Sequence, residues 1–155
     1  MKALALLFKT DGTYSTLILR LTLGVVFLPH GAQKALGWFG GHGFAGTMGY
    51  FTQHLHIPAL FAFLAIAAEF AGAIALIFGF FSRVAAFGIA ATMAVAIFMG
   101  HLQNGFFMNW SGTQKGEGFE YHLLAIGIAV ALMIRGGGKY SIDSAITRKL
   151  NTLND

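Results

Sequence analysis

A 24-residue stretch, Pro58–Phe81, is apolar except for one charged residue, and its length and composition predict a helix that crosses a lipid bilayer. At about 1.5 Å per residue, a helix of this length crosses the ~30 Å hydrocarbon core of a membrane. The stretch has a single charged residue, Glu69, which is the twelfth residue and would lie near the bilayer midplane. An ionised carboxylate costs about 3 kcal/mol there on insertion scales. Glu69 must therefore face protein or water and find either a partner or a proton.

The composition agrees with a membrane protein made of one domain, residues 1–155. Hydrophobic residues make up 56% of the chain and charged residues 10%, whereas soluble domains have about 25% charged residues. The mean hydropathy is +0.68. The net charge of +4 is not concentrated in a basic cluster, so the sequence argues against nucleic-acid binding. Because the chain has no cysteine, it can form no disulfide and no thiolate metal site of its own.

Four segments are long and apolar enough to be predicted as membrane spans: about 16–36, 58–81, 84–100 and 119–134. Positive charges flank the same ends of these segments, at Lys2, Lys9, Arg20, Arg83, Arg135, Lys139, Arg148 and Lys149. The opposite side has only Lys34 and Lys115. The positive-inside rule then places both termini in the cytoplasm, which requires an even number of spans. We therefore predict an all-α integral protein of the cytoplasmic membrane, folded as an antiparallel bundle of four transmembrane helices.

The first outer connection, residues 37–57, is predicted to contain a short interfacial helix. Phe44, Met48, Phe51 and Leu55 fall on one narrow face at about 100° per residue, while Thr47 falls elsewhere. Such a helix would lie in the outer interface with its apolar face toward the membrane and cap the bundle.

The first predicted span concentrates its polar residues on one face. On a helix, six residues fall within about a third of the circumference: Arg20, Gly24, Phe27, His30, Gly31 and Lys34. We expect this face to point into the bundle. Arg20 then has two interpretations, either a charge that extends to the membrane surface or an ion pair with Glu69. Lys34 is expected to extend outward or to contact acidic groups of the outer loops.

Histidines from three helices are predicted to meet in the outer half of the bundle. They are His30, His101 and His122, with Glu120 at the same level and Glu69 below. Imidazoles and carboxylates on converging helices can hold a metal or pass protons, and a histidine pair can hold haem. The spacing contains no HExxH or other local metal motif. We therefore expect a hydrogen-bonded polar network and no metal.

Several motifs together resemble the DoxX family of small four-helix membrane proteins. They are LRLTLGVVFLPHGAQKALG, IPALFAFLAIAAEFAGAIALIFGFFSR, GEGFEYHLL and GGGKYSIDSAI, which extend from about Leu19 to Ile146. The resemblance covers Arg20, Gly24, His30, Gly31, Lys34, Glu69, Gly72, Gly79, Arg83, Glu120, Tyr121, Gly136, Gly138, Tyr140, Ser141 and Asp143. The chain departs from the family at Gly137, where proline is common. The resemblance implies a four-span protein of the cytoplasmic membrane. Some relatives are subunits of quinone-linked sulfur oxidation or join membrane oxidoreductase complexes in oxidative-stress defence.

Three functions stay open at this point. The first is a quinone-interacting subunit of an oxidoreductase or redox-stress complex, which needs a redox partner protein or a bound cofactor because the chain has no evident electron carrier. Its candidate proton relay is Glu69 with His30, and its candidate binding residues are Arg20, His30, Lys34, Glu69, Glu120, Tyr121 and His122. The second is a small proton-coupled transporter built around Glu69. It would need a homo-oligomer, because four short spans enclose little volume. The third is a non-catalytic membrane scaffold that Arg20 and Glu69 lock together.

Overall fold

The computed structural model describes residues 7–152, and within them every regular element is helical. Lys2, one of the positive charges on which the predicted orientation of the spans rests, lies outside this range. The main helices are α2 (Tyr14–Leu36), α3 (Gly43–Gly49), α4 (Ala59–Phe78), α5 (Ser82–Ala96), α6 (Glu120–Arg135) and α7 (Ile142–Thr152). Short 3-10 turns span Trp38–Gly40 and Leu102–Asn104, and π-helical turns span Tyr50–His54 and Ile97–His101.

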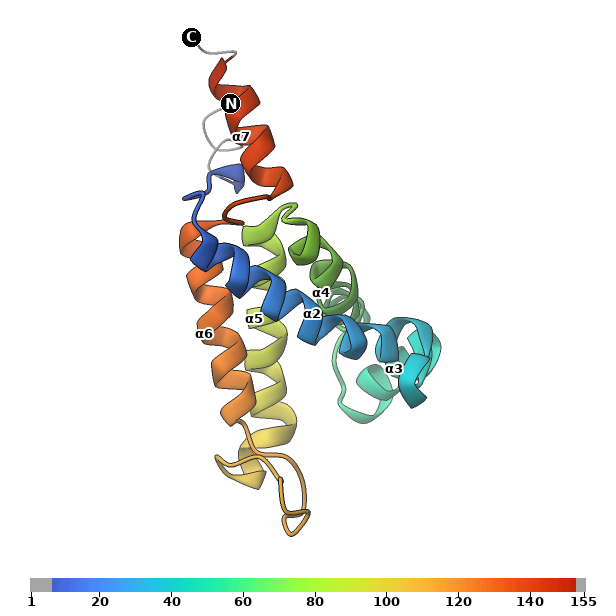
Figure 1. Cartoon of the computed structure of the whole chain (residues 1–155). Coiled ribbons are helices and arrows are strands. Elements are labelled where there is room, and N and C mark those ends of the chain that lie inside the picture. The colour runs from blue at the N-terminus through green and yellow to red at the C-terminus, as the bar shows by residue number, and fades with distance from the viewer. Residues whose placement is uncertain (1–6, 153–155) are drawn as a thin grey trace.

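Within residues 7–152, three helical segments are long and apolar enough to cross a membrane: α2, α4, and α5 with its continuation to Asn104. The fourth helix of the bundle, α6, has 16 residues. Helix α4 packs against α2 and α5, and α6 packs against α5 and α2. Figure 1 shows α5 and α6 running side by side in opposite directions while α2 crosses them at an angle. The start of α2, the α4–α5 turn and the end of α6 meet at one end of the bundle, and the 102–118 loop lies at the other (Figure 1).

The helices end where glycine allows a left-handed backbone. Gly37 follows α2 with φ 75° and Gly79 follows α4 with φ 68°. Residues with a side chain rarely adopt this conformation, so glycine is the usual residue after a helix C-terminus. At the other end of α2, the Thr13 hydroxyl accepts from the Thr16 amide and caps the helix. The chain can thus reverse sharply between spans.

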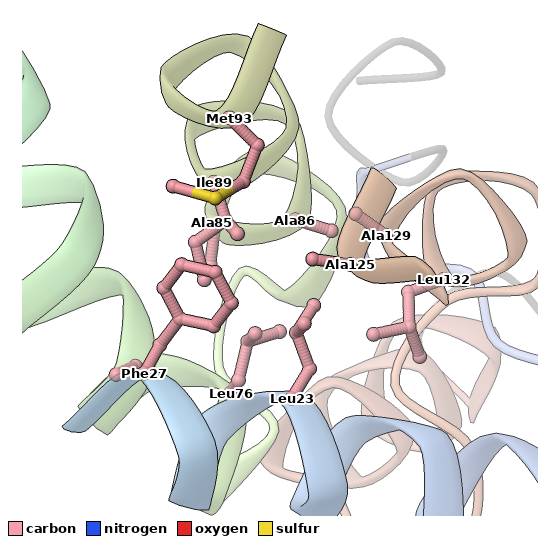
Figure 2. Packing of buried hydrophobic residues seen from close by; sticks show 11 residues of the cluster. Leu23, Phe27, Leu76, Ala85, Ala86, Ile89, Met93, Ala125, Ala129 and Leu132 are labelled. Atoms are coloured by element: carbon pink, nitrogen blue, oxygen red, sulfur yellow. The ribbon is translucent and has the colours of Figure 1, made fainter. Parts of the chain in front are cut away.

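The interior of the bundle is apolar and closely packed. In Figure 2, Phe27 of α2 points toward Ala85 and Ile89 of α5, and Leu23 of α2 points toward Ala125 of α6. At the α5–α6 contact, Ala86 faces small residues of α6 such as Ala129, and both alanines have no exposed surface. Small side chains let membrane helices approach closely, so dispersion contacts hold the bundle together where lipid removes most of the hydrophobic driving force.

The outer surface of the bundle is apolar as well. Large hydrophobic side chains on all four bundle helices are at least half exposed: Ile18, Val25, Leu60, Phe61, Leu64, Phe78, Val84, Phe87, Phe98, Leu124 and Ile134. Soluble monomers rarely show apolar surface on this scale. The surface fits contact with lipid.

Glycines set the crossing of α2 and α4. A Cβ atom placed on Gly31 would lie 2.5 Å from the Phe70 Cα and 2.6 Å from the Glu69 carbonyl carbon. One placed on Gly24 would lie 2.9 Å from the Ile77 side chain. Only glycine permits this approach, and the closest point of the crossing falls beside Glu69.

The outer helix differs from the expected amphipathic helix in its packing. Helix α3 contacts α2 and α4 and lies at the side of the bundle away from α6 (Figure 1). Its buried residue is Thr47, which is 6% exposed, whereas Phe44 is 45% exposed with its ring against Phe63. The π-helical turn after Gly49 widens the helix, so a constant 100° spacing does not describe which residues share a face.

Candidate functional site

A partly buried ion pair joins α2 and α4 at their crossing. The Lys34 Nζ lies 2.6 Å from the Glu69 Oε2, and the two side chains are 27% and 4% exposed. Lys34 also donates to the carbonyl of His30 at 3.5 Å. The pair removes much of the cost of placing a carboxylate inside the bundle, because the opposite charge and the hydrogen bond replace lost solvation. Lys34 therefore turns inward, contrary to the expectation that it extends outward or meets acids of the outer loops.

Two aromatic groups lie beside this pair. The His30 ring is exposed at the edge of α2 and lies 6.3 Å from the Tyr121 ring of α6. Both rings are within electrostatic range of the Glu69 carboxylate. The Tyr121 hydroxyl is buried and has no hydrogen-bond partner among the described residues. Four of the predicted site residues thus come together, from α2, α4 and α6. We call Lys34, Glu69, His30 and Tyr121 the Glu69 cluster.

Arg20 lies elsewhere, at the end of the bundle where α4 and α6 terminate. It is 1% exposed and donates to the carbonyls of Gly137 at 2.9 Å, Leu76 at 2.6 Å and Tyr140 at 3.3 Å. It also donates to the carbonyls of Ile77 and Lys139. These bonds engage all five N–H donors of a guanidinium. The hypothesis that Arg20 pairs with Glu69 is therefore wrong. The alternative interpretation, in which the Arg20 charge extends to the membrane surface, is wrong as well.

The position of Arg20 follows from the needs of helix ends. The last carbonyls of α4 have no intrahelical partner and carry partial negative charge, so a buried cation there is stabilised. Asp143 places a negative charge at the start of α5, where the first amides have no intrahelical partner. Its carboxylate accepts from the Phe81 amide at 2.8 Å and the Ser82 amide at 2.9 Å. We call this assembly of Arg20, the α4–α5 turn and residues 136–143 the Arg20 junction.

The glycines of the C-terminal motif allow the Arg20 junction to close. A Cβ on Gly137 would lie 2.5 Å from the Ser82 Oγ and 3.0 Å from Ser141. Gly136 and Gly138 have φ values of 83° and 73°. Arg83 completes this end of the bundle by donating to the Met133 carbonyl of α6. The motif residues around Arg20 therefore fasten the helices, and their donors are engaged with backbone.

Glu120 holds the 102–118 loop in place through hydrogen bonds. Its Oε1 accepts from the Met108 amide at 3.0 Å and from the Trp110 indole at 3.3 Å. Glu117 accepts from the Asn109 amide at 2.6 Å in the same loop. The structure thus places Glu120 with the loop backbone, although the sequence predicted it among the binding residues.

Two of the three histidines meet as predicted. The His101 and His122 rings have centroids 4.1 Å apart. The Tyr121 ring is 5.6 Å from the His122 ring and 6.3 Å from the His30 ring of α2. No group of three or more metal-ligating side chains is found within residues 7–152. His101 was not among the predicted binding residues. Its position at the end of the third predicted span, level with His122, was the signal for this contact.

Comparison with known proteins agrees with the membrane character of the fold. The family model for DoxX matches residues 15–102, which include Arg20, His30, Lys34, Glu69 and His101. The chain is 29% identical over 133 residues to "Inner membrane protein YqjF" of Escherichia coli (strain K12), covering 86% of this chain and 92% of that protein. It is 31% identical over 117 residues to "Putative oxidoreductase CatD" of Bacillus subtilis (strain 168), covering 76% and 77%. No solved structure matches the chain significantly.

The apolar helices and their apolar exterior define an all-helical membrane protein that contacts lipid. Because the family model matches more than half of its residues, the chain belongs to the DoxX family.

Proposed function

We propose that this chain is the membrane subunit of a quinone-linked oxidoreductase or redox-stress complex and that the Glu69 cluster binds the quinone head group. The observation that carries the proposal is the buried hydroxyl of Tyr121, which has no partner among the described residues, near the buried carboxylate of the Lys34–Glu69 pair. An unsatisfied buried hydroxyl costs about 1–3 kcal/mol, and a ligand carbonyl would remove that cost. The name of the Bacillus subtilis relative supports a redox role for that protein.

The residues present suit a quinone. The Tyr121 hydroxyl can donate to one of its carbonyls, and the exposed edge of His30 gives the cluster a side that faces lipid. The Phe27 ring stacks toward Tyr121 at 6.2 Å with an interplanar angle of 22°, which supplies an apolar wall. Ligand sites of this kind combine apolar walls with a few placed donors.

When bound, a quinone takes up two electrons and two protons, and here the electrons would come from a redox partner protein. The chain's own groups would bind the head group and supply protons. The Lys34 Nζ donates to the Glu69 Oε2 at 2.6 Å and so joins a buried carboxylate to a partly exposed ammonium group. Because the Lys34 side chain is 27% exposed, it can exchange a proton with the surface. Glu69 would keep the ion pair in place beside Tyr121.

We further propose that α6 is a fourth span, that both termini are cytoplasmic and that the protein lies in the cell membrane. The cations Arg83, Arg135 and Lys139 gather at the end of the bundle where α2 begins, and Lys115 lies in the loop at the other end. At 16 residues α6 would extend about 24 Å, which a locally thinner bilayer accommodates. Since the chain has no cysteine, single cysteines at Ser111 and Arg148 test this with an impermeant maleimide. Only Ser111→Cys should react in intact cells.

A photoreactive azidoquinone tests the location of the site. We expect light to attach the label to the part of α2 around His30 and the start of α6 around Tyr121, and excess unlabelled quinone to suppress the labelling. The outer loop offers an internal control, because a hollow of about 320 Å³ there is lined by His42, Gly46, Gly49, Tyr50, Gln53 and His54. Labelling confined to this hollow, or labelling that excess quinone leaves unchanged, would contradict the proposal.

A non-catalytic scaffold is the second candidate, and the Arg20 junction favours it. Arg20, Arg83 and Asp143, which belong to the DoxX-like motifs, all bond to the chain's own backbone. In a scaffold, the Glu69 cluster would likewise serve only to hold the helices together. It predicts that the protein binds no quinone but that loss of the cluster prevents assembly with partner proteins.

A further inference from the structure

His101 and His122 form a pair of rings outside the Glu69 cluster, and this pair has a ring nitrogen without a partner among the described residues. The two rings come from different elements, the π-helical turn after α5 and the first turn of α6, and their centroids are 4.1 Å apart. His122 is 5% exposed, and its Nδ1 has no hydrogen-bond partner among the described residues. Buried polar atoms without a partner are rare in proteins, and a bound ion is one of the groups that can satisfy them.

The surroundings of His101 fix which of its ring atoms is free. Its Nδ1 lies 2.9 Å from the carbonyl oxygen of Glu117. A carbonyl can only accept, so in the neutral ring Nδ1 holds the hydrogen and donates it, which leaves the lone pair on Nε2. The Asn104 amide donates to the same carbonyl at 3.0 Å and helps to hold it. A ring nitrogen bonded to a backbone carbonyl is the usual support for a histidine that binds metal through the other nitrogen.

The spacing of the rings decides between two kinds of metal group. With metal–nitrogen bonds of about 2.0–2.1 Å, two imidazoles on opposite faces of a haem iron would have centroids about 6 Å apart. Two imidazoles on adjacent positions of one ion would have centroids about 4.5–5 Å apart. The observed 4.1 Å leaves no room for haem between the rings. It is within a small side-chain adjustment of an adjacent pair.

We propose that His101 and His122 form a two-histidine site for a divalent transition-metal ion such as Zn²⁺ or Cu²⁺. Imidazole nitrogens suit these ions, and water or an exogenous ligand would complete the coordination. The ion would connect the end of α5 to the start of α6 at the base of the 102–118 loop. The proposal is independent of quinone binding, because it uses neither Lys34 nor Glu69.

Metal titration of the full-length, detergent-solubilised protein without a histidine tag tests the site. We expect one Zn²⁺ per chain by competition with a chromophoric chelator, and Cu²⁺ whose EPR spectrum shows coupling to two imidazole nitrogens. His101→Gln and His122→Gln should each weaken the affinity about tenfold or more. His54→Gln, which changes an exposed outer-loop histidine, is the matched control and should leave the affinity unchanged.

Three outcomes would overturn the site: no stoichiometric binding, binding that both variants retain, or binding that is lost in His54→Gln. The last would identify adventitious binding by exposed histidines. His101 is only partly buried, so its variant should keep the melting temperature of the metal-free wild type. That variant keeps the test decisive if His122→Gln fails to fold.

Discussion

At the scale of single residues, the rare charges of this chain divide into two groups by what they contact. Arg20 and Asp143 are 1% exposed and bond to backbone at helix ends. Lys34 and Glu69 bond to each other. All five N–H donors of Arg20 bind backbone carbonyls and both oxygens of Asp143 accept from backbone amides, so these charges are fixed by the fold. A pair of side chains, in contrast, can exchange its partner for a ligand. This difference is why the candidate site is the Glu69 cluster.

The ion pair makes a prediction for stability. Glu69→Gln leaves Lys34 without its partner, and Lys34→Met leaves a buried carboxylate. We expect each to lower the free energy of unfolding by roughly 3 kcal/mol, the lower end for buried pairs, because the Lys34 side chain is 27% exposed. The double variant should lose less than the sum, because neither group is then left alone. Chemical unfolding in detergent measures the cycle, with Lys115→Met on an exposed loop as the control. Additive losses would show that the two groups do not interact.

A second prediction at the residue scale is that Asp11, which precedes α2, makes the stability of the protein depend on pH. Burial acts to raise the pKa of its carboxyl group, but hydrogen bonds from Thr13 and Thr16 and the contact with Arg135 outweigh it and hold the pKa below its ordinary value. A carboxyl group with a lowered pKa stabilises the fold above its unfolded pKa of about 3.9. That contribution is lost as the pH falls through the folded pKa. Asp11→Asn should therefore melt earlier than the wild type at neutral pH, and this difference should vanish in acid. A difference that persists in acid would contradict the account.

At the scale of helices, the α2–α4 crossing brings the Glu69 cluster together. Gly31 makes the crossing close enough for the Lys34 side chain, one turn further along α2, to reach Glu69. Helix association in membranes depends on such close approach. The geometry of the site is therefore a property of two packed helices and not of any one motif.

A substitution of Gly31 tests the importance of this crossing. In Gly31→Ala the new Cβ would meet the Phe70 backbone, which cannot move alone, so the helices must separate. We expect a loss of about 1–3 kcal/mol in the free energy of unfolding. Gly127→Ala is the matched control in α6, because nothing lies within 4 Å of its Cβ. That control should be neutral or more stable by up to about 1 kcal/mol. Equal effects of the two substitutions would refute the close crossing.

Helices were predictable from the sequence, whereas side-chain pairs were not. The apolar runs end at glycines such as Gly37 and Gly79, so helices α2 and α4 begin and end close to the expected ranges. The partner of Glu69 depends on the angle between two helices, which a one-dimensional pattern does not contain. Arg20 was misassigned for a similar reason: the carbonyls that bind it, at Leu76 and Gly137, have no sequence signal.

At the scale of the whole molecule, the contacts that hold the helices together and the candidate binding sites lie in different parts of the bundle. The Arg20 junction joins α2, α4, α5 and the segment after α6 at one end of the bundle. The Glu69 cluster and the histidine pair lie further along the bundle, beyond the residues that fasten it. A bundle fixed at one end can keep its helices in register while the other end accommodates a ligand.

The most direct test of the central claim is quinone affinity of Tyr121→Phe, which removes one hydroxyl and no packing. Because that hydroxyl has no partner within the described chain, the variant should melt at or slightly above the wild-type temperature. Its affinity for a short-chain quinone should fall about three- to tenfold through the loss of one hydrogen bond, and Tyr50→Phe in the outer loop should change neither value. If Tyr121→Phe binds quinone as tightly as the wild type, the Glu69 cluster is not the quinone site.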